Sequence, residues 1–330
     1  MSLKLLFAAA IVSAALASAC SGGDGNGGAT SAGCGSTGVI AVGAKPWAVA
    51  LDAAHSRLYA GNEFDNTVSV LNLCTHETIT TLNSGTGPNS ISVDHRTGRA
   101  YVSNFNSNDV TVIQDDKVVQ TVPVGAAPWA VLADETAGRA YVANSSGGSV
   151  MVLAPDSASP VATAPGFQDP RGLARSGRTL YVADAGANSV HAVDLDTLQP
   201  TGEVAVGEHP QGMAIDAAAN RLYVTNVEDA SVSVVDLSSL SVVATIPVGL
   251  SPLQIAVDPQ AHTAYTADSF ADTVTVIDTQ TDSVIATSDA AKKPWDVEVS
   301  DDGLYIYVAS AGTGEIKVFS PEQLAGSSGG

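Results

Sequence analysis

The sequence is poor in charged, aromatic and sulfur-containing residues, and its few charges are mostly of one sign. Charged residues make up 15% and aromatic residues 5% of the 330 residues, and 14 Lys and Arg stand against 34 Asp and Glu, giving a net charge of −20. A surface this acidic repels phosphate groups, so we expect no nucleic acid partner. Hydrophobic residues make up 45%, which is enough for a large core.

Motifs for several common chemistries are also missing. The sequence has no Cys-x-x-Cys-His for covalent haem, and no nucleophile elbow, phosphate loop or zinc-protease motif. The 6 histidines are scattered along the chain, so a ring of His ligands for copper is not expected. We expect no cofactor, with calcium or magnesium as an alternative that rests on two carboxylates discussed below.

The first residues carry an export signal. Lys4 precedes an apolar stretch from Leu5 to Leu16, which is too short to cross a bilayer as a helix. The small residues Ala17-Ser18-Ala19 follow, and they lead directly to Cys20. This order predicts a signal peptide over residues 1–19. Residues 20–37 are rich in Gly and Ser, which predicts a flexible tether.

The end of this signal resembles the lipobox of bacterial lipoproteins, with Ala17 where Leu is commoner. The resemblance implies that Cys20 becomes an acylated first residue that anchors the protein to a membrane without spanning it. Ser21 in the second position implies the outer membrane, on its periplasmic or its cell-surface side. The alternative is secretion after cleavage at the same bond. Cys34 and Cys74 then remain as candidates for a disulfide, since an exported protein enters an oxidising compartment.

A motif of about forty residues occurs seven times after the tether. Its first marker is a proline, at spacings of 42, 40, 42, 40, 42 and 42 residues. Its second marker is a tyrosine that follows the proline by thirteen residues, or by eleven in the fourth copy. The two sets are Pro46, Pro88, Pro128, Pro170, Pro210, Pro252 and Pro294, and Tyr59, Tyr101, Tyr141, Tyr181, Tyr223, Tyr265 and Tyr307. Chance does not place seven such pairs in register.

Each copy contains four short segments of β-type composition separated by turn residues, and none shows a long helical period. A period near forty with four strands is typical of a propeller blade. The seventh copy stops near Phe319 after three strands, and an extra strand, Gly38 to Val42, precedes the first proline. The sequence therefore predicts an all-β, seven-bladed β-propeller over residues 38–320, with four-stranded antiparallel blades. The N-terminal strand would close the ring in the last blade, and residues 321–330 would form a flexible tail.

Most copies read Tyr-Val-x-Asn or Tyr-Val-x-Asp, as in Tyr101-Val102-Ser103-Asn104 and Tyr223-Val224-Thr225-Asn226. These motifs resemble the YVTN repeat family of bacterial β-propellers over nearly the whole mature chain. The resemblance implies the propeller fold and a place in the cell envelope. Propellers with related repeats include lactonases, lyases and cofactor-binding oxidoreductases, so the fold does not define an activity.

Several recurring residues are expected to serve the fold. The Asn or Asp that ends the second strand would bond the backbone of a turn. Five arginines recur near five aspartates around the turn between the first and second strands, which predicts a repeated Arg–carboxylate clamp. The two sets are Arg57, Arg99, Arg139, Arg178 and Arg221, and Asp52, Asp94, Asp134, Asp216 and Asp258.

Function is expected where the copies differ. The loops that enter the first strand and leave the second strand share one face, here called the top face. Trp47, Trp129 and Trp295 follow the proline in three copies, Arg171 takes that place in a fourth, and His209 lies beside them. Indole rings on this face either cover the edge of the core or form an aromatic floor for an apolar, sugar or peptide ligand.

The innermost strand of the seventh copy differs from the others. Its second and fourth positions after the proline hold Asp296 and Glu298, where other copies have small or neutral residues. Residues two apart on a strand point to the same side. The two carboxylates are candidate ligands for Ca²⁺ or Mg²⁺, and the alternative is charge solvated by water in the channel.

The sequence names no catalytic residue. We expect a monomeric recognition or scaffold protein of the cell envelope whose top face binds a protein, peptide or glycan. The alternative is a lactonase- or lyase-like enzyme with a divalent cation at the centre of the top face and His209 as its base. That alternative requires His209 and at least two acidic side chains to meet in one cavity.

Overall fold

The computed structural model describes residues 36–326. The predicted signal peptide, the predicted lipidation site Cys20, Cys34 and residues 327–330 lie outside the described residues. Cys74 is disulfide-bonded, and its pairing with Cys34 stays a prediction. No described helix is both long enough and apolar enough to cross a bilayer.

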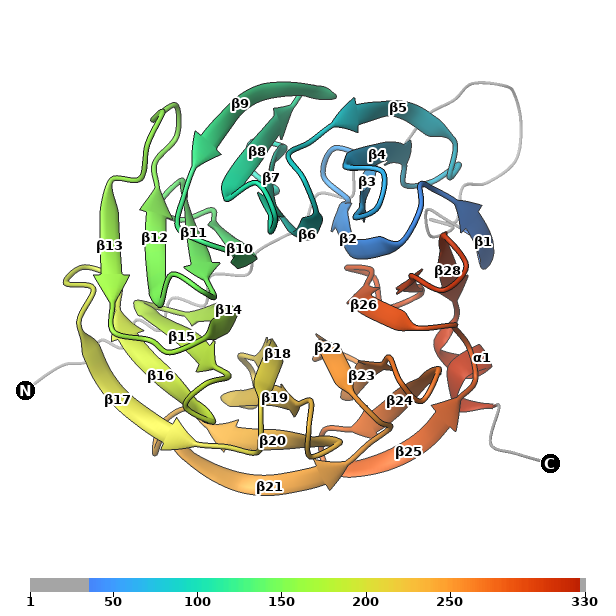
Figure 1. Cartoon of the computed structure of the whole chain (residues 1–330). Coiled ribbons are helices and arrows are strands. Elements are labelled where there is room, and N and C mark those ends of the chain that lie inside the picture. Colours follow the sequence, from blue (N-terminus) through green and yellow to red (C-terminus); the bar gives the residue numbers. More distant parts are fainter. Residues whose placement is uncertain (1–35, 327–330) are drawn as a thin grey trace, which may run out of the picture. The chain divides into compact units, whose positions relative to one another are not determined.

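The described chain is a ring of seven four-stranded antiparallel sheets, as predicted (Figure 1). In each blade the proline opens the innermost strand, and the tyrosine lies on the second strand. From the channel outward the blades are β2 (Pro46–Asp52), β3 (Arg57–Asn62), β4 (Thr67–Asn72) and β5 (Thr78–Asn83); β6 (Pro88–Asp94), β7 (Arg99–Asn104), β8 (Asp109–Gln114) and β9 (Lys117–Pro123); β10 (Pro128–Asp134), β11 (Arg139–Asn144), β12 (Ser149–Leu153) and β13 (Ala162–Pro165); β14 (Pro170–Ser176), β15 (Thr179–Asp184), β16 (Ser189–Asp194) and β17 (Pro200–Ala205); β18 (Pro210–Asp216), β19 (Arg221–Asn226), β20 (Ser231–Asp236) and β21 (Ser241–Pro247); β22 (Pro252–Asp258), β23 (Thr263–Asp268), β24 (Thr273–Asp278) and β25 (Ser283–Ser288); and β26 (Pro294–Val299), β27 (Ile306–Ser310), β28 (Glu315–Phe319) and β1 (Gly38–Ala41).

The N-terminal strand closes the ring. Strand β1 pairs antiparallel with β28, and Ile40 lies opposite Ile316. Both isoleucines are buried in a cluster that also contains Val49 of blade 1. The pairing confirms the predicted closure and gives the last blade its fourth strand.

The core lies between the blades. Each of the seven hydrophobic clusters joins residues of two neighbouring blades, so the ring has seven interfaces and seven clusters. Tyr59 of blade 1, for example, packs with Ile91 and Val93 of blade 2. All seven repeat tyrosines are buried. The repeat period therefore reflects the same arrangement of packed side chains at each of the seven interfaces.

Helix α1 (Pro321–Ala325) corrects the prediction of a flexible tail for its part of residues 321–330. Leu324 is fully buried against β25 of blade 6. In blade 5 the turn between the third and fourth strands supplies a comparable leucine, since Leu240 packs against Gly202 of blade 4. Blade 7 lacks that turn because its fourth strand comes from the other end of the chain. Helix α1 supplies the missing apolar side chain, which sequence periodicity did not reveal.

The Asn or Asp that ends the second strand ties the blade to the loop that enters it. Asn62 accepts a hydrogen bond from Gly43 N at 2.9 Å and donates to Thr67 and Ser69. Its partner is thus the incoming loop, not only the next turn. The close approach explains the glycine, because a Cβ at Gly43 would lie 2.5 Å from Asn62 Cγ.

The predicted Arg–carboxylate clamp is wrong. The turn aspartates accept hydrogen bonds from their own turn, as Asp134 does from Thr136 N and Ala137 N. Arg57 extends to Asp116 of the next blade at 2.8 Å, and other arginines pair with third-strand residues, such as Arg221 with Asp236. Each of the five turn aspartates accepts one or two backbone N–H hydrogen bonds from its own turn, which is the usual role of aspartate in a turn.

Candidate functional site

The top face is built from the loops that enter the inner strands and the turns that follow the second strands. Backbone hydrogen bonds join them, as from Glu63 N to Lys45 O at 3.0 Å and from Phe270 N to Leu250 O at 3.1 Å. Each blade therefore presents two connected loops on this face.

A bulge follows the proline of each inner strand and releases one side chain from the sheet. In blade 1, Pro46 pairs with Asn62 and Ala48 with Gly61, which leaves Trp47 without a partner in the ladder. All seven blades show a register shift after the proline, and in blades 3 and 5 it also leaves the next residue, Ala130 or Gly212, without a partner. Bulges redirect side chains in this way at the rims of closed sheets. The seven released residues form the top mouth, namely Trp47, Asn89, Trp129, Arg171, Gln211, Leu253 and Trp295.

Two of the predicted tryptophans stack on each other. The rings of Trp47 and Trp295 lie 4.1 Å apart between centroids, with their planes within 1° of parallel. They belong to the first and last blades, so the stack crosses the joint at which the ring closes. The stack covers one face of each indole.

Trp129 and Arg171 form a second group on the top mouth. The guanidinium carbon of Arg171 lies 4.3 Å from the centre of the Trp129 ring, a cation–π geometry. Arg171 donates hydrogen bonds to Asp169 Oδ2 at 3.0 Å and to Gln211 Oε1 at 3.2 Å. Phe105 meets Trp129 edge to face at 5.4 Å. The charge of Arg171 is therefore compensated by Asp169, and its guanidinium is held against the Trp129 ring.

His209 lies in the loop that enters blade 5. Its Nδ1 is 3.7 Å from Glu228 Oε1, and its backbone N–H donates to Asn188. Burial lowers the pKa of His209, and the charge of Arg171 lowers it further. The imidazole is thus neutral near pH 7.

Large apolar side chains project from the top face. The side chains of Phe64, Leu250 and Phe270 are 68%, 62% and 80% exposed. They occupy loop tips of blades 1 and 6, on either side of blade 7, which carries Trp295. Sequence reasoning did not single out these three residues, although each is a large apolar residue in a turn position that other copies give to small or polar residues.

The two candidate metal ligands lie in the channel. Asp296 and Glu298 line a cavity of about 170 Å³ with residues from the inner strands of blades 2 to 6. Burial raises the pKa of Asp296 to about 7. Burial also raises the pKa of Glu298 well above its usual value, and the nearby Asp296 and Asp301 raise it further. Burial therefore favours the protonated form of both carboxyl groups.

Asp296 also joins two blades. Its Oδ2 accepts a hydrogen bond from Val49 N of blade 1 at 3.0 Å. The corresponding Ser90 accepts from Val131 N of blade 3 at 3.4 Å. Asp296 thus fills the acceptor position that Ser90 fills in blade 2. Within residues 36–326, no three His, Cys, Asp or Glu side chains form a group suited to a metal ion, and the Ca²⁺ or Mg²⁺ site stays a prediction.

A histidine–carboxylate cluster lies at the opposite, bottom end of the channel. Asp52 contacts His55 at 2.9 Å and His95 at 3.5 Å, and His95 lies 3.9 Å from Glu135. The hydrogen bond to Asp52 raises the pKa of His95 against the effect of burial. Sequence reasoning did not show that one aspartate contacts both histidines.

The fold defines the chain as a seven-bladed β-propeller. No family model matches the sequence, and no curated protein matches it either. Among solved structures, the chain is similar to hydrazine synthase of Kuenenia stuttgartiensis, with 17% identity and a TM-score of 0.74 over 86% of this chain and 97% of that chain. At this identity the similarity shows the shared fold alone.

Proposed function

We propose that the protein is a recognition or scaffold propeller of the bacterial cell envelope that binds a partner protein through its top face. The observation that carries this proposal is the set of exposed apolar tips Phe64, Leu250 and Phe270 around the stacked tryptophans. Exposed aromatic side chains that flank polar groups are typical of protein interfaces.

A protein partner fits these tips better than a glycan or a short peptide. The three side chains are largely exposed at loop tips and project from the surface. A projecting side chain is buried well only when the partner supplies the hollow that receives it. A glycan would instead need the outer faces of Trp47 and Trp295, which stack against each other on their inner faces.

The lactonase- or lyase-like alternative has less support. It requires His209 to meet at least two carboxylates in one cavity. The cavity that Asp296 and Glu298 line has no contribution from His209. The nearest carboxylate to His209 is that of Glu228, which is 63% exposed.

We further propose that lipid on Cys20 anchors the propeller to the outer membrane through the tether of residues 20–37. The YVTN-like repeats and the lipobox-like signal support this location. Substitution of Cys20 with alanine should move the protein from the detergent phase to the aqueous phase in a detergent partition of intact cells. An unchanged distribution would favour secretion without a lipid.

Site-specific photo-crosslinking in the native cell tests the top-face proposal. A photoreactive phenylalanine analogue at Phe64 or Phe270 should yield a discrete protein adduct. The same analogue at Val243, which is 48% exposed on the outer strand β21, is the matched control. Adducts from Val243 as abundant as those from Phe64 would contradict the proposal. A melting temperature that added oligosaccharides raise, and that no added protein raises, would also contradict it.

A further inference from the structure

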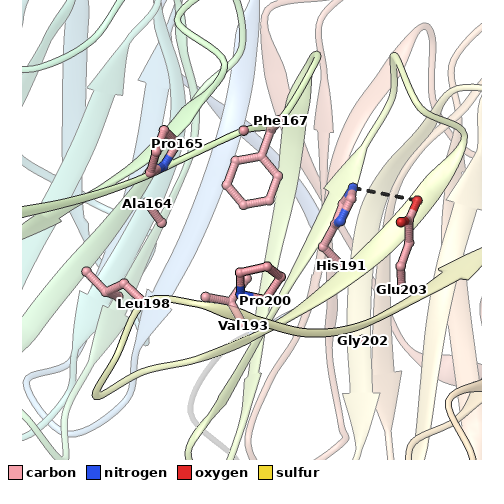
Figure 2. A pocket seen from close by; sticks show the side chains of 10 residues that line it. Ala164, Pro165, Phe167, His191, Val193, Leu198, Pro200, Gly202 and Glu203 are labelled. Atoms are coloured by element: carbon pink, nitrogen blue, oxygen red, sulfur yellow. Dashed lines mark ion pairs between the residues drawn. The ribbon is translucent and has the colours of Figure 1, made fainter.

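A cavity of about 390 Å³ opens on the outside of the ring between blades 3 and 4 (Figure 2). Its walls are apolar, with Pro165 and Phe167 on one side and Val193, Leu198 and Pro200 on the other. His191 and Glu203 stand together at one end. A cavity of this size with apolar walls and few polar groups is typical of small-molecule sites.

The polar end of this cavity departs from the repeat. His191 on β16 lies directly opposite Glu203 on β17. In four other blades the same cross-strand position holds two hydroxyl side chains, namely Ser69 and Thr81, Thr111 and Thr121, Ser233 and Thr245, and Thr275 and Thr287. In those blades the third-strand hydroxyl contacts the Asn or Asp that ends the second strand, as Thr275 does with Asp268. His191 keeps this contact through Asp184, so the carboxylate of Glu203 is the part of the pair that the fold does not explain.

The apolar wall departs from the repeat as well. Ala164 occupies the inward position of an outer strand, where five other blades have a larger aliphatic residue, namely Ile40, Leu82, Val122, Val204 and Ile246. The smaller side chain leaves space in the groove. Phe167 occupies the loop position that is glycine in five other loops, and its ring meets His191 edge to face at 5.4 Å. Four departures from the repeat thus converge on one cavity.

The polar end is negatively charged. His191 Nε2 lies 3.5 Å from Asp184 and 4.0 Å from Glu203. Burial raises the pKa of Asp184, but hydrogen bonds from His191, Asp169 N and Gln168 N outweigh it and lower the pKa. Asp184 is therefore ionised. No Lys or Arg is among the residues that line the cavity, and the Glu203 side chain is 56% exposed.

We propose that this cavity binds a small apolar amine, with its ring or alkyl chain between the proline and valine walls and its ammonium group at Glu203. A carboxylate next to an aromatic ring suits an organic cation, because the carboxylate pairs with the charge and the ring edge or face contacts its carbons. The net charge of −20 favours the approach of such a ligand. This site is separate from the top face, so each proposal can fail alone.

Binding of 2-phenylethylammonium to the full chain tests the proposal, with neutral 2-phenylethanol as its uncharged counterpart. Saturation-transfer NMR and calorimetry should detect the amine and not the alcohol. Glu203→Gln keeps the shape of the side chain and should weaken amine binding by about fivefold, as expected for a partly exposed ion pair. Ala164→Ile should abolish binding, because isoleucine fills this position in other blades.

Glu77→Gln is the matched control, since Glu77 is an exposed carboxylate on another blade, and it should leave the amine affinity unchanged. Melting temperatures check that the variants fold. If Ala164→Ile does not fold, Glu203→Thr replaces it as a test, because four other blades have threonine at this position. The proposal is overturned if alcohol and amine bind equally, if Glu203→Gln or a folded Ala164→Ile leaves the affinity unchanged, or if the amine does not bind at millimolar concentration.

Discussion

Trp47 and Trp295 stack face to face, 4.1 Å apart, across the joint between the first and last blades. The hydrogen bond from Val49 N to Asp296 crosses the same joint, and the pairing of β1 with β28 within blade 7 packs against it through the cluster that contains Val49. A propeller whose last blade is assembled from both ends of the chain is held there by contacts far apart in sequence. Three different kinds of interaction thus reinforce the joint.

The stack should make a measurable contribution to stability. A double-mutant cycle with Trp47→Ala and Trp295→Ala should give a coupling free energy of about 1 kcal/mol, as aromatic pairs do beyond their area burial. Urea unfolding at constant pH measures it. Trp47→Ala combined with Trp129→Ala, whose rings are not paired, should be additive within about 0.5 kcal/mol. Equal coupling in both cycles would show that the stack adds nothing specific.

Leu324 should matter more than its place near the end of the chain suggests. Leu324→Ala removes a fully buried side chain and should lower the free energy of unfolding by about 3 kcal/mol. Urea unfolding should show a lower midpoint with an unchanged slope. Leu250→Ala, at 62% exposure, is the control and should change stability by less than about 0.5 kcal/mol. Similar small effects for both would mean that α1 does not replace the missing turn.

The ring, the blade count and the closing strand could be predicted because each depends on a pattern repeated seven times. The proline spacing places the inner strands, and the tyrosine marks the buried second strand. Helix α1 could not be predicted in this way, because it occurs once and compensates for a turn that only the closed ring shows to be missing.

The candidate site was predictable only in part. The sequence could give the residues after the prolines equivalent positions in the seven blades, because the repeat sets them there. Their partners were not predictable, since the stack of Trp47 on Trp295 and the packing of Arg171 on Trp129 depend on distances between blades. The outer cavity was visible in principle, because His191 and Glu203 break the hydroxyl pattern of the strands. Recognising it required the strand register that the structure supplies.

The cluster at the bottom of the channel should make stability depend on pH. The hydrogen bond from His95 to Asp52 raises the pKa of His95, so its contribution is complete below the ordinary pKa of about 6.5 and disappears as the pH rises through the higher folded value. His95→Gln should therefore destabilise the protein at pH 6 and have little effect at pH 9. The difference should stay below about 1 kcal/mol, because the side chain is 44% exposed and solvent screens it.

The remaining charges around His95 are Asp52, His55, Glu135 and Asp301. In an Asp52→Asn background the same His95→Gln substitution should lose most of its dependence on pH. Urea midpoints at several pH values measure both effects. A pH dependence that persists without Asp52 would assign it to Glu135 or Asp301.

Asp296 should act in the same direction and over a wider range of pH. Its folded pKa of about 7 lies above the ordinary value of 3.8, so the folded state keeps a proton that the unfolded state releases. Its contribution is complete below pH 3.8 and is lost as the pH rises through 7. Asp296→Asn imitates the protonated form, so relative to the wild type it should gain on the order of 2 kcal/mol between pH 5 and pH 8. Exposed Glu77, changed to glutamine, should give no gain, and parallel curves of stability against pH for Asp296→Asn and the wild type would refute the assignment.

If the channel pair holds Ca²⁺ or Mg²⁺, the cation must compensate the charge that develops at pH 8. Millimolar calcium would then raise the wild-type midpoint at pH 8 but not that of Asp296→Asn, whereas equal midpoints with and without calcium would leave the carboxylates as inter-blade acceptors.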